Sequence, residues 1–217
     1  MLYDKDIREP LFEYLEEQYG KTRFLEEVCI GKTRTDVIMV TEASLVGIEI
    51  KSDADTYARL ARQVKDYNRV FDYNIVAVGS RHANSIKEHV PEYWGIITIE
   101  EQNGIDFYWY REPKKNPKRE RTVMFRNQFS LLWRPEIAHI QEKNNLPKYK
   151  NFGKDKVIRK IMEKLPEEIL KKDICEALFE RDYTTIQETI QQYKMNNIHK
   201  NGKNSLLHLF SMLNSNT

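Results

Sequence analysis

The sequence predicts an α/β fold in which helices flank a mixed central sheet, with a small helical region at the C-terminal end. Short β-branched or aromatic runs alternate with segments whose apolar residues recur at helical spacing, and from about residue 121 onward only helical patterns follow. With 217 residues, 40% of them apolar, the chain is long enough to bury a core. One compact domain with a smaller appendage is therefore expected.

The first predicted element is a helix over residues 4–20. Aspartates suited to capping begin it, Leu11, Phe12 and Leu15 follow at helical spacing, and Gly20 ends it.

Six short runs bounded by turn residues predict strands. They are residues 23–30, 35–41, 45–52, 74–80, 95–100 and 105–112. An amphipathic helix at 56–72 separates the third strand from the fourth, and a short helix at 83–90 separates the fourth from the fifth. Strands interleaved with helices in this order are typical of a mixed sheet that carries helices on its faces.

The C-terminal part predicts only helices. A helical pattern runs from Arg121 through residues 129–140, and two or three short helices fill residues 154–213. The segment 144–153 between them is rich in Asn, Pro, Lys and Gly, which favours a loop. We therefore predict an α/β domain over residues 1–145 and a basic helical region over residues 146–217.

Charge is unevenly distributed, although the net charge is only +2. Residues 111–126 hold seven bases against two acids, and a second basic stretch covers residues 143–172. Clustered Lys and Arg can form a phosphate-binding surface, or they can simply be solvated. The C-terminal helices are thus open to DNA or to a protein partner that the sequence does not identify.

No apolar run reaches the roughly 20 residues that a membrane-spanning helix needs, and the N-terminus lacks the pattern of a secretion signal. A cytoplasmic protein without membrane contact is expected. The two cysteines, Cys29 and Cys175, lie far apart and have no His or Cys neighbours at metal-binding spacing. They indicate neither a disulfide framework nor a zinc site.

Three charged residues interrupt two of the most apolar stretches. Side chains alternate between the faces of a strand, so Glu49 and Lys51 share one face. If residues 41–44 form a four-residue hairpin loop, Val40 pairs with Leu45, and Asp36 then lies across from Glu49. Directly opposed side chains have Cβ atoms about 4.5–5.5 Å apart, so two carboxylates would meet beside an ammonium group.

Two adjacent carboxylates repel unless a cation lies between them. Mg²⁺, or Mn²⁺ in its place, takes one or two carboxylates together with waters and a phosphate oxygen, and the carbonyl of Ile50 could add a ligand. The cation would activate a water, and Lys51 could hold that water or the scissile phosphate. The alternative is an ordinary ion pair between Asp36 and Lys51, with Glu49 incidental.

The pattern of Asp36, Glu49 and Lys51 resembles the metal site of the PD-(D/E)xK nuclease superfamily. Twelve residues separate Asp36 from Glu49, and Thr35 stands where the superfamily name has proline. Further segments are similar to a subgroup of bacterial and phage proteins assigned to that superfamily. They are "DIRE", "EIKSDADT", "RLARQVKDYNRVFD", "VAVGSRH", "VPEYWGI" and "LLWRPE". The resemblance covers roughly residues 4–140 and implies a restriction-endonuclease-like core and DNA as the substrate.

The resemblance implies further site residues. Gln63 and Tyr67, four apart on one helix face, resemble the Q-x-x-x-Y element that lies beside the catalytic residues and contacts DNA in exonuclease-like branches of the superfamily. Tyr67 also belongs to the apolar stripe of its helix, so core packing is an equal alternative. Glu9, or Glu13 one turn later, corresponds to an acid that completes or supports the metal site. An exposed helix face is the commoner explanation for either.

Four cations are candidates for steering phosphates: Arg8, Lys32, Arg34 and Arg62. Such contacts set affinity and salt dependence without reading sequence. The leading hypothesis is a Mg²⁺-dependent deoxyribonuclease from a phage or mobile element. Its rival is a DNA-binding or adaptor protein that retains the nuclease fold without turnover, and homodimerisation stays open.

Overall fold

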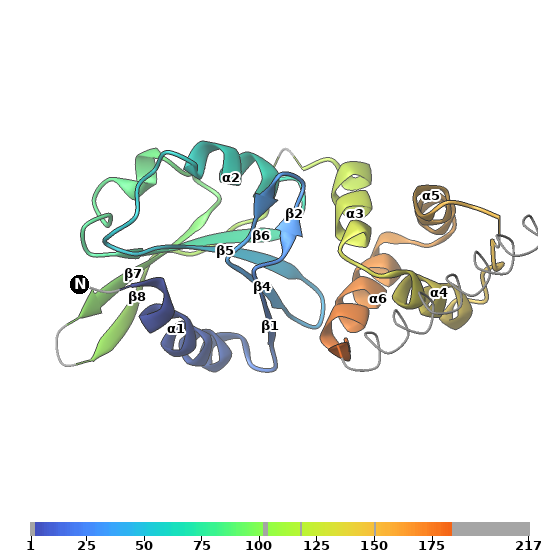
Figure 1. Cartoon of the computed structure of the whole chain (residues 1–217), viewed down its shortest axis with the longest axis horizontal. Helices are drawn as coiled ribbons and strands as arrows, with labels where there is room; N and C mark the ends of the chain where they lie inside the picture. The colour runs from blue at the N-terminus through green and yellow to red at the C-terminus, as the bar shows by residue number, and fades with distance from the viewer. Residues whose placement is uncertain (1–2, 102–103, 118, 150, 184–217) are drawn as a thin grey trace, which may run out of the picture. The chain divides into compact units, whose positions relative to one another are not determined.

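The computed structural model describes residues 3–101, 104–117, 119–149 and 151–183 (Figure 1). One compact unit comprises residues 1–179, and residues 180–217 are assigned to a second. Within the first unit the helices and strands follow one another in this order: α1 (Asp4–Tyr19), β1 (Arg23–Glu26), β2 (Cys29–Ile30), β3 (Thr33–Arg34), β4 (Val37–Val40), β5 (Leu45–Lys51), α2 (Leu60–Tyr67), β6 (Tyr73–Gly79), the 3₁₀ helix η1 (Ile86–Glu88), β7 (Gly95–Glu101), β8 (Ile105–Arg111), α3 (Arg121–Ser130), α4 (Arg134–Lys143), α5 (Lys154–Lys164) and α6 (Glu167–Phe179).

A six-stranded mixed sheet forms the centre, with the strand order β1-β4-β5-β6-β7-β8. Strand β4 is antiparallel to its neighbours β1 and β5, strands β5, β6 and β7 are parallel, and β8 is antiparallel to β7. A separate hairpin, β2–β3, precedes β4. This sheet and its flanking helices confirm the predicted α/β fold and are consistent with a restriction-endonuclease-like core.

Helix α1 covers one face of the sheet, and α2 lies over the other (Figure 1). Ile7, Leu11 and Leu15 of α1 recur at a spacing of four and are fully buried against strand residues such as Ile48 and Ile50. Burying a side chain of this size stabilises the fold by about 1.5–3 kcal/mol relative to exposure. The α1 face of β5 is therefore a continuous apolar layer, and the charged residues of β5 occupy its other face.

The β4–β5 hairpin has the register that the sequence predicts. Val40 pairs with Leu45, Val37 pairs with Ile48, and the amide of Thr41 donates to the carbonyl of Ser44 across the turn. Counting one pair beyond Val37 and Ile48 places Asp36 across from Glu49. The expected juxtaposition of these two residues thus follows from the hairpin alone.

Four predicted elements differ from the observed ones. The helix expected at 56–72 is shorter in the structure, where α2 covers only Leu60–Tyr67. The strand expected at 23–30 is split into β1 and β2 because Glu27 adopts a left-handed backbone conformation, with φ of 55°. The helix expected at 83–90 is reduced to η1, since its turns close through bonds between residues three apart and Pro91 follows. The helical pattern expected through 129–140 is broken at residues 131–133 between α3 and α4.

Buried polar contacts tie the helical part to the sheet. Asp72, which immediately precedes β6, is 2% exposed. Its carboxylate accepts hydrogen bonds from the Leu45 amide at 3.1 Å, from Gln128 of α3 at 3.1 Å and from Arg119 at 3.0 Å, and Lys171 of α6 lies 3.6 Å away. The predicted boundary at residue 145 falls inside the unit 1–179, and the division of the chain into a domain over 1–145 and a helical region over 146–217 stays a prediction. Of the helices predicted for 154–213, α5 and α6 are observed, and the part beyond residue 183 lies outside the described residues.

Gly47 sets how closely α2 approaches β5. A Cβ atom at this position would lie 2.1 Å from Cδ2 of Phe71 and 2.7 Å from Cδ1 of Tyr67. Since Tyr67 is on α2 and Phe71 follows that helix, any larger residue would push this segment away from the strand that carries Glu49.

We expect Gly47→Ala to lower the free energy of unfolding by about 1–3 kcal/mol, because a methyl group there overpacks the interface. The measurement is urea denaturation followed by circular dichroism. Gly153→Ala is the matched control, since nothing lies within 4 Å of the atom it adds. Equal stability of the two variants would contradict the close approach.

Candidate active site

The candidate site is centred on Glu49, which lies on β5 and is fully buried. Its side chain shares the α2 face of the strand with Lys51, whose Nζ donates to Glu49 Oε1 at 2.6 Å. The Lys51 side chain is also buried, at 6% exposure. A buried ion pair is costly to desolvate, so it persists only where further hydrogen bonds satisfy the charges.

Helix α2 supplies these further hydrogen bonds. Gln63 donates its Nε2 to Glu49 Oε1, and the Tyr67 hydroxyl donates to Oε2 at 2.7 Å. The spacing of four residues brings both side chains to the same side of the helix. The sequence-predicted residues Glu49, Lys51, Gln63 and Tyr67 are therefore together in one buried network.

Tyr67 both packs in the core and contacts the candidate site residues, the two alternatives that the sequence left open. It is fully buried in the core, and its hydroxyl also lies 3.2 Å from the carbonyl oxygen of Ile48 and accepts from the Asp36 amide at 3.3 Å. Burial and the nearby carboxylates of Glu49 and Asp36 raise the pKa of Tyr67, so the hydroxyl keeps its proton and remains a donor. Full burial is contrary to the direct nucleic-acid contact predicted for Tyr67, which instead orients Glu49.

Asp36 immediately precedes β4 and faces the same network. Its Oδ2 accepts a hydrogen bond from the amide of Ile50 at 2.8 Å. Burial and the charge of Glu49 raise the pKa of Asp36 from 3.8 to about 7, against the opposing effects of the Ile50 hydrogen bond and of Lys51. The charge of Glu49 thus acts on the ionisation of Asp36, as expected for the two carboxyl groups that the hairpin register sets across from each other.

The oxygen atoms around this acid pair suit a hard divalent cation. Gln63 Oε1 is buried and has no hydrogen-bond partner among the described residues. The Ile50 carbonyl points to the same side of β5 as its amide, which faces Asp36. Within the described part of the chain, no group of three or more His, Cys, Asp or Glu side chains could hold a metal. A cation here would have two carboxylates completed by neutral oxygens and water, which fits Mg²⁺ or Mn²⁺.

Glu9 is not part of this cluster. It is exposed on α1, and neither it nor Glu13 joins Asp36 and Glu49 in a metal-binding group among the described residues. The acid of α1 whose charge acts on Asp36 is Asp4, one and a half turns earlier. The predicted role of Glu9 as a metal ligand has no support in this arrangement, because α1 turns that residue toward solvent.

Arg8 has a different role from the one predicted. Its guanidinium bonds to Asp4 at 2.8 Å, to Glu26 at 2.8 Å and to Glu27 at 2.6 Å. It also donates to the backbone carbonyl of Asp36 at 3.3 Å. These partners engage the group that was predicted to bind phosphate, so Arg8 fixes the Asp36 segment in this structure.

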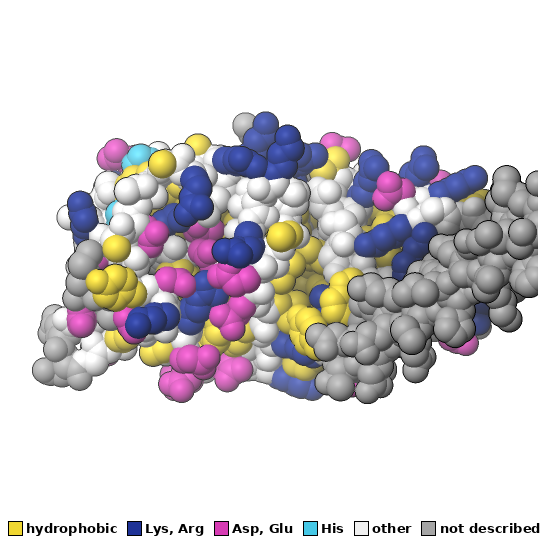
Figure 2. Space-filling model, viewed as in Figure 1, with side chains coloured by type: hydrophobic (Ala, Val, Ile, Leu, Met, Phe, Trp, Pro, Cys, Tyr) yellow, Lys and Arg dark blue, Asp and Glu magenta, His cyan; other side chains and the backbone are white. Residues whose placement is uncertain are grey.

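The other predicted cations, Lys32, Arg34 and Arg62, are exposed. The Arg62 guanidinium donates to the carbonyl of Lys32 at 2.8 Å, which joins α2 to the tip of the β2–β3 hairpin, and Arg34 pairs with Glu27 at 2.6 Å. Figure 2 shows acidic side chains gathered between α1 and α2, with Lys and Arg side chains around them. Phosphate binding by Lys32, Arg34 and Arg62 stays a prediction.

The structure adds supporting residues that the sequence interpretation missed. His82 is buried; its Nε2 lies 3.1 Å from the carbonyl of Ser52, the residue after Lys51, and its Nδ1 lies 2.9 Å from the Tyr57 hydroxyl. Glu27 bonds both Arg8 and Arg34, and its amide donates to the Asp36 carbonyl at 3.0 Å. No spacing rule links these residues to the site, because tertiary contacts bring them there.

The chain matches one family of known proteins along most of its length. The family model described as Bacteriophage P4 protein cII matches residues 1–208. No curated protein matches the chain. Two chains of solved structures match. One belongs to Pyrococcus furiosus SfsA in complex with Ca²⁺, with 10% identity and a TM-score of 0.30; the match covers 48% of this chain and 59% of the SfsA chain. None of the described helices is both long enough and apolar enough to cross a membrane.

The raised pKa of Asp36 predicts a pH-dependent stability. The fold favours the protonated acid, so the stabilisation is present below about pH 4 and is lost as the pH rises through about 7. At about pH 8 we expect the free energy of unfolding of Asp36→Asn to exceed that of the wild type by roughly 2–4 kcal/mol, so the variant should unfold at a higher temperature. Below about pH 4 the two proteins should unfold at the same temperature. Differential scanning fluorimetry across this range measures the difference.

Asp106→Asn, an exposed acid on β8, is the control and should follow the wild-type curve. Adding Mg²⁺ or Mn²⁺ at high pH should stabilise the wild type but not Asp36→Asn, because only the acid offers a charged ligand. Superimposable curves for Asp36→Asn and the wild type would remove the electrostatic argument.

The buried ion pair predicts strong coupling between its members. Lys51→Met leaves Glu49 buried beside no cation and should cost about 3–5 kcal/mol. Combining it with Glu49→Gln should restore most of that loss, since the amide can still accept from Tyr67. Denaturation of the four proteins in a double-mutant cycle gives the coupling energy. Additive effects would mean that the two groups do not interact.

Proposed function

This chain belongs to the Bacteriophage P4 protein cII family, and we propose that it is a metal-dependent nuclease that hydrolyses phosphodiester bonds of DNA. The observation that carries the proposal is the convergence of Asp36 and Glu49 from adjacent strands, beside Lys51, in a buried and polar site. The order Asp, Glu-x-Lys resembles the metal site of PD-(D/E)xK nucleases. Three charges on or directly beside buried strands seldom occur without a function or a partner.

Asp36 and Glu49 would hold the cation, with the Ile50 carbonyl and Gln63 Oε1 as neutral oxygens nearby. Bound there, Mg²⁺ or Mn²⁺ would act as a Lewis acid on the phosphoryl oxygen and promote attack by water. The Asp36 carboxyl, with its pKa near 7, gives up its proton readily in neutral solution. Its carboxylate is then available as a ligand without a large proton cost.

Lys51 can interact with two groups, the Glu49 carboxylate and the scissile phosphate. In the free protein its ammonium neutralises Glu49 at 2.6 Å. When that carboxylate has another cation, Lys51 can turn to the scissile phosphate and stabilise the negative charge that develops there. Tyr67 and Gln63 keep Glu49 in place during this exchange, because their hydrogen bonds come from the fixed surface of α2.

The substrate would approach from the side that carries Lys32, Arg34 and Arg62. All three are exposed, and two of them come from the hairpin that leads directly into Asp36. Lys and Arg side chains attract the phosphate backbone irrespective of sequence, so they would give salt-dependent binding to DNA. A role in phage biology is the biological context that the family suggests.

The test is incubation of the full-length protein with linear, circular and single-stranded DNA in Mg²⁺, in Mn²⁺ or in chelator. We expect metal-dependent cleavage that Asp36→Asn, Glu49→Gln and Lys51→Met reduce by at least about a hundredfold, since each removes a charge from the reacting centre. Glu9→Gln, on the exposed face of α1, is the matched acid control and should cleave normally.

Single-stranded RNA in the same assay gives the substrate preference. Binding of DNA without cleavage in any metal would refute the nuclease and favour the rival hypothesis, a DNA-binding or adaptor protein that retains the fold. Loss of cleavage in Glu9→Gln would restore that residue to the metal site.

A further inference from the structure

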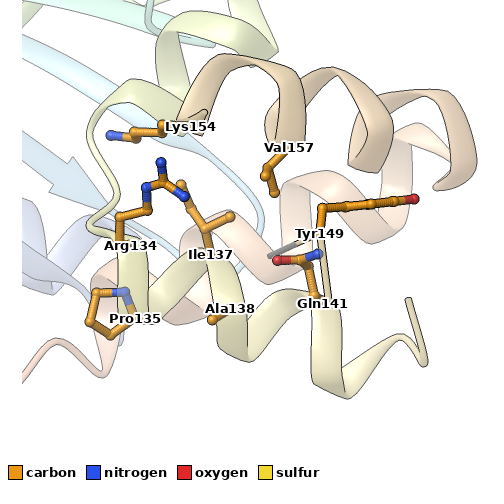
Figure 3. Close-up of a pocket in the computed structure, with 8 residues that line it drawn as sticks. All are labelled: Arg134, Pro135, Ile137, Ala138, Gln141, Tyr149, Lys154 and Val157. Atoms are coloured by element: carbon orange, nitrogen blue, oxygen red, sulfur yellow. The ribbon is translucent and has the colours of Figure 1, made fainter. Parts of the chain in front are cut away.

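A pocket of about 300 Å³ lies in the helical part, away from the acid pair. It is formed by α4, α5 and the connection between them, and it is lined by Arg134, Pro135, Ile137, Ala138, Gln141, Tyr149, Lys154 and Val157 (Figure 3). Its volume is at the lower end of the range for small-molecule sites. The candidate active site uses none of these residues.

One end of the pocket is cationic. Arg134 and Lys154, the first residues of α4 and α5, lie near each other there (Figure 3). The Lys154 ammonium donates to the carbonyls of Leu132 at 2.6 Å and Ser130 at 3.1 Å, so its charge is held in a fixed position. The exposed Arg134 guanidinium makes a long contact of 3.4 Å with the Phe152 carbonyl and has further donors for an anion.

The remainder of the pocket combines apolar surface with one acceptor. Ile137 and Val157 are buried and form its floor. Gln141 donates its Nε2 to the Pro147 carbonyl at 2.6 Å, so the amide oxygen is the atom left to accept a hydrogen bond. At the far end Tyr149 stacks on Phe152, with ring centroids 5.2 Å apart and planes within 5°.

The surroundings are rich in positive charge. Arg126, Lys156 and Arg159 are exposed on α3 and α5. Figure 2 shows Lys and Arg side chains gathered over this part of the molecule. Lys156 also places its Nζ 3.9 Å from the centre of the Phe152 ring. Basic and aromatic side chains interleaved in this way are typical of surfaces that bind single-stranded nucleic acids.

We propose that this pocket binds one unpaired nucleotide of a nucleic-acid strand, with the phosphate at Arg134 and Lys154 and the sugar and base on the apolar floor. The paired cations match a phosphate, and the apolar floor with a single acceptor matches a base better than a second charged group. A base-paired nucleotide cannot enter a pocket of this size, so the site selects single strands or frayed ends. This inference rests on the proposed function, since it gives the nuclease a second hold on its substrate.

The test is binding of a fluorescent, short single-stranded oligonucleotide to the full chain in chelator, where cleavage plays no part. Arg134→Gln should weaken binding about tenfold, the effect of losing a hydrogen bond to a charged group. Arg159→Gln, an exposed arginine of α5 outside the pocket, is the matched control and should change affinity at most about twofold. Equal effects of the two variants would reduce the site to general surface charge and overturn the proposal.

Ala138→Trp separates the pocket from its charge. Ala138 is exposed at the pocket wall, so the indole fills the cavity while every cation remains. Binding of single strands should fall about tenfold or more, because the indole occupies the space proposed for the base and the contacts of the base with the pocket are lost. Binding of duplex DNA should change little. Unchanged binding of single strands by Ala138→Trp would overturn the proposal.

Three competition results bear on the ligand. Equal competition by inorganic phosphate and by a nucleoside monophosphate would indicate an anion site without base recognition, and tighter binding of a polyglutamate peptide would indicate an acidic protein partner; each would overturn the assignment. Stronger competition by the nucleoside monophosphate than by phosphate or polyglutamate supports it. Since every measurement is made in chelator, loss of DNA cleavage in metal tests the proposed function separately from the pocket.

Discussion

Burial of the Glu49 carboxylate between β5 and α2 is the constraint on which the rest of the site depends. A buried carboxylate must be paired and hydrogen-bonded, and here Lys51, Gln63 and Tyr67 meet that need. Two of these donors belong to α2, which can reach the strand only because Gly47 has no side chain. A glycine that carries no chemistry thus decides how the acid is held, and the same contacts extend through Tyr67 to the backbone of Asp36.

The free site has an imbalance of charge that a cation would remove. One ammonium group, that of Lys51, lies beside two acidic side chains. The second negative charge is therefore unfavourable, and the pKa of Asp36 rises to about 7. Such an arrangement is less stable than a neutral one, and proteins retain it where function requires it. The surrounding ion pairs have a complementary effect: Arg8 and Glu27 hold the backbone of Asp36, so the acid is fixed in place although its charge is unfavourable.

The helical part is joined to the sheet through charge as well as apolar packing. Asp72 receives donors from the start of β5, from α3 and from Arg119, with Lys171 of α6 close by, so the start of β5 and the helices share one buried acid. The pocket between α4 and α5 is therefore carried on the same folded unit as the acid pair. A nucleic-acid strand bound at the pocket would therefore be bound by the same folded unit that positions Asp36 and Glu49.

The sequence by itself determined the parts of this protein that depend on local pattern. Alternation along 37–40 and 45–51 and a four-residue turn were enough to predict the register that sets Asp36 across from Glu49, and a spacing of four put Gln63 and Tyr67 together. Only the tertiary structure decided which charges are exposed and which are engaged. In the sequence Glu9 and Arg8 are neighbouring charged residues of one helix, and nothing there distinguishes an exposed side chain from a paired one. In the structure Glu9 is exposed, whereas Arg8 forms ion pairs with three acids. Contacts between residues far apart in the chain, such as His82 with the carbonyl of Ser52 or Lys154 with the carbonyl of Leu132, follow from how whole elements pack, which no short-range pattern encodes.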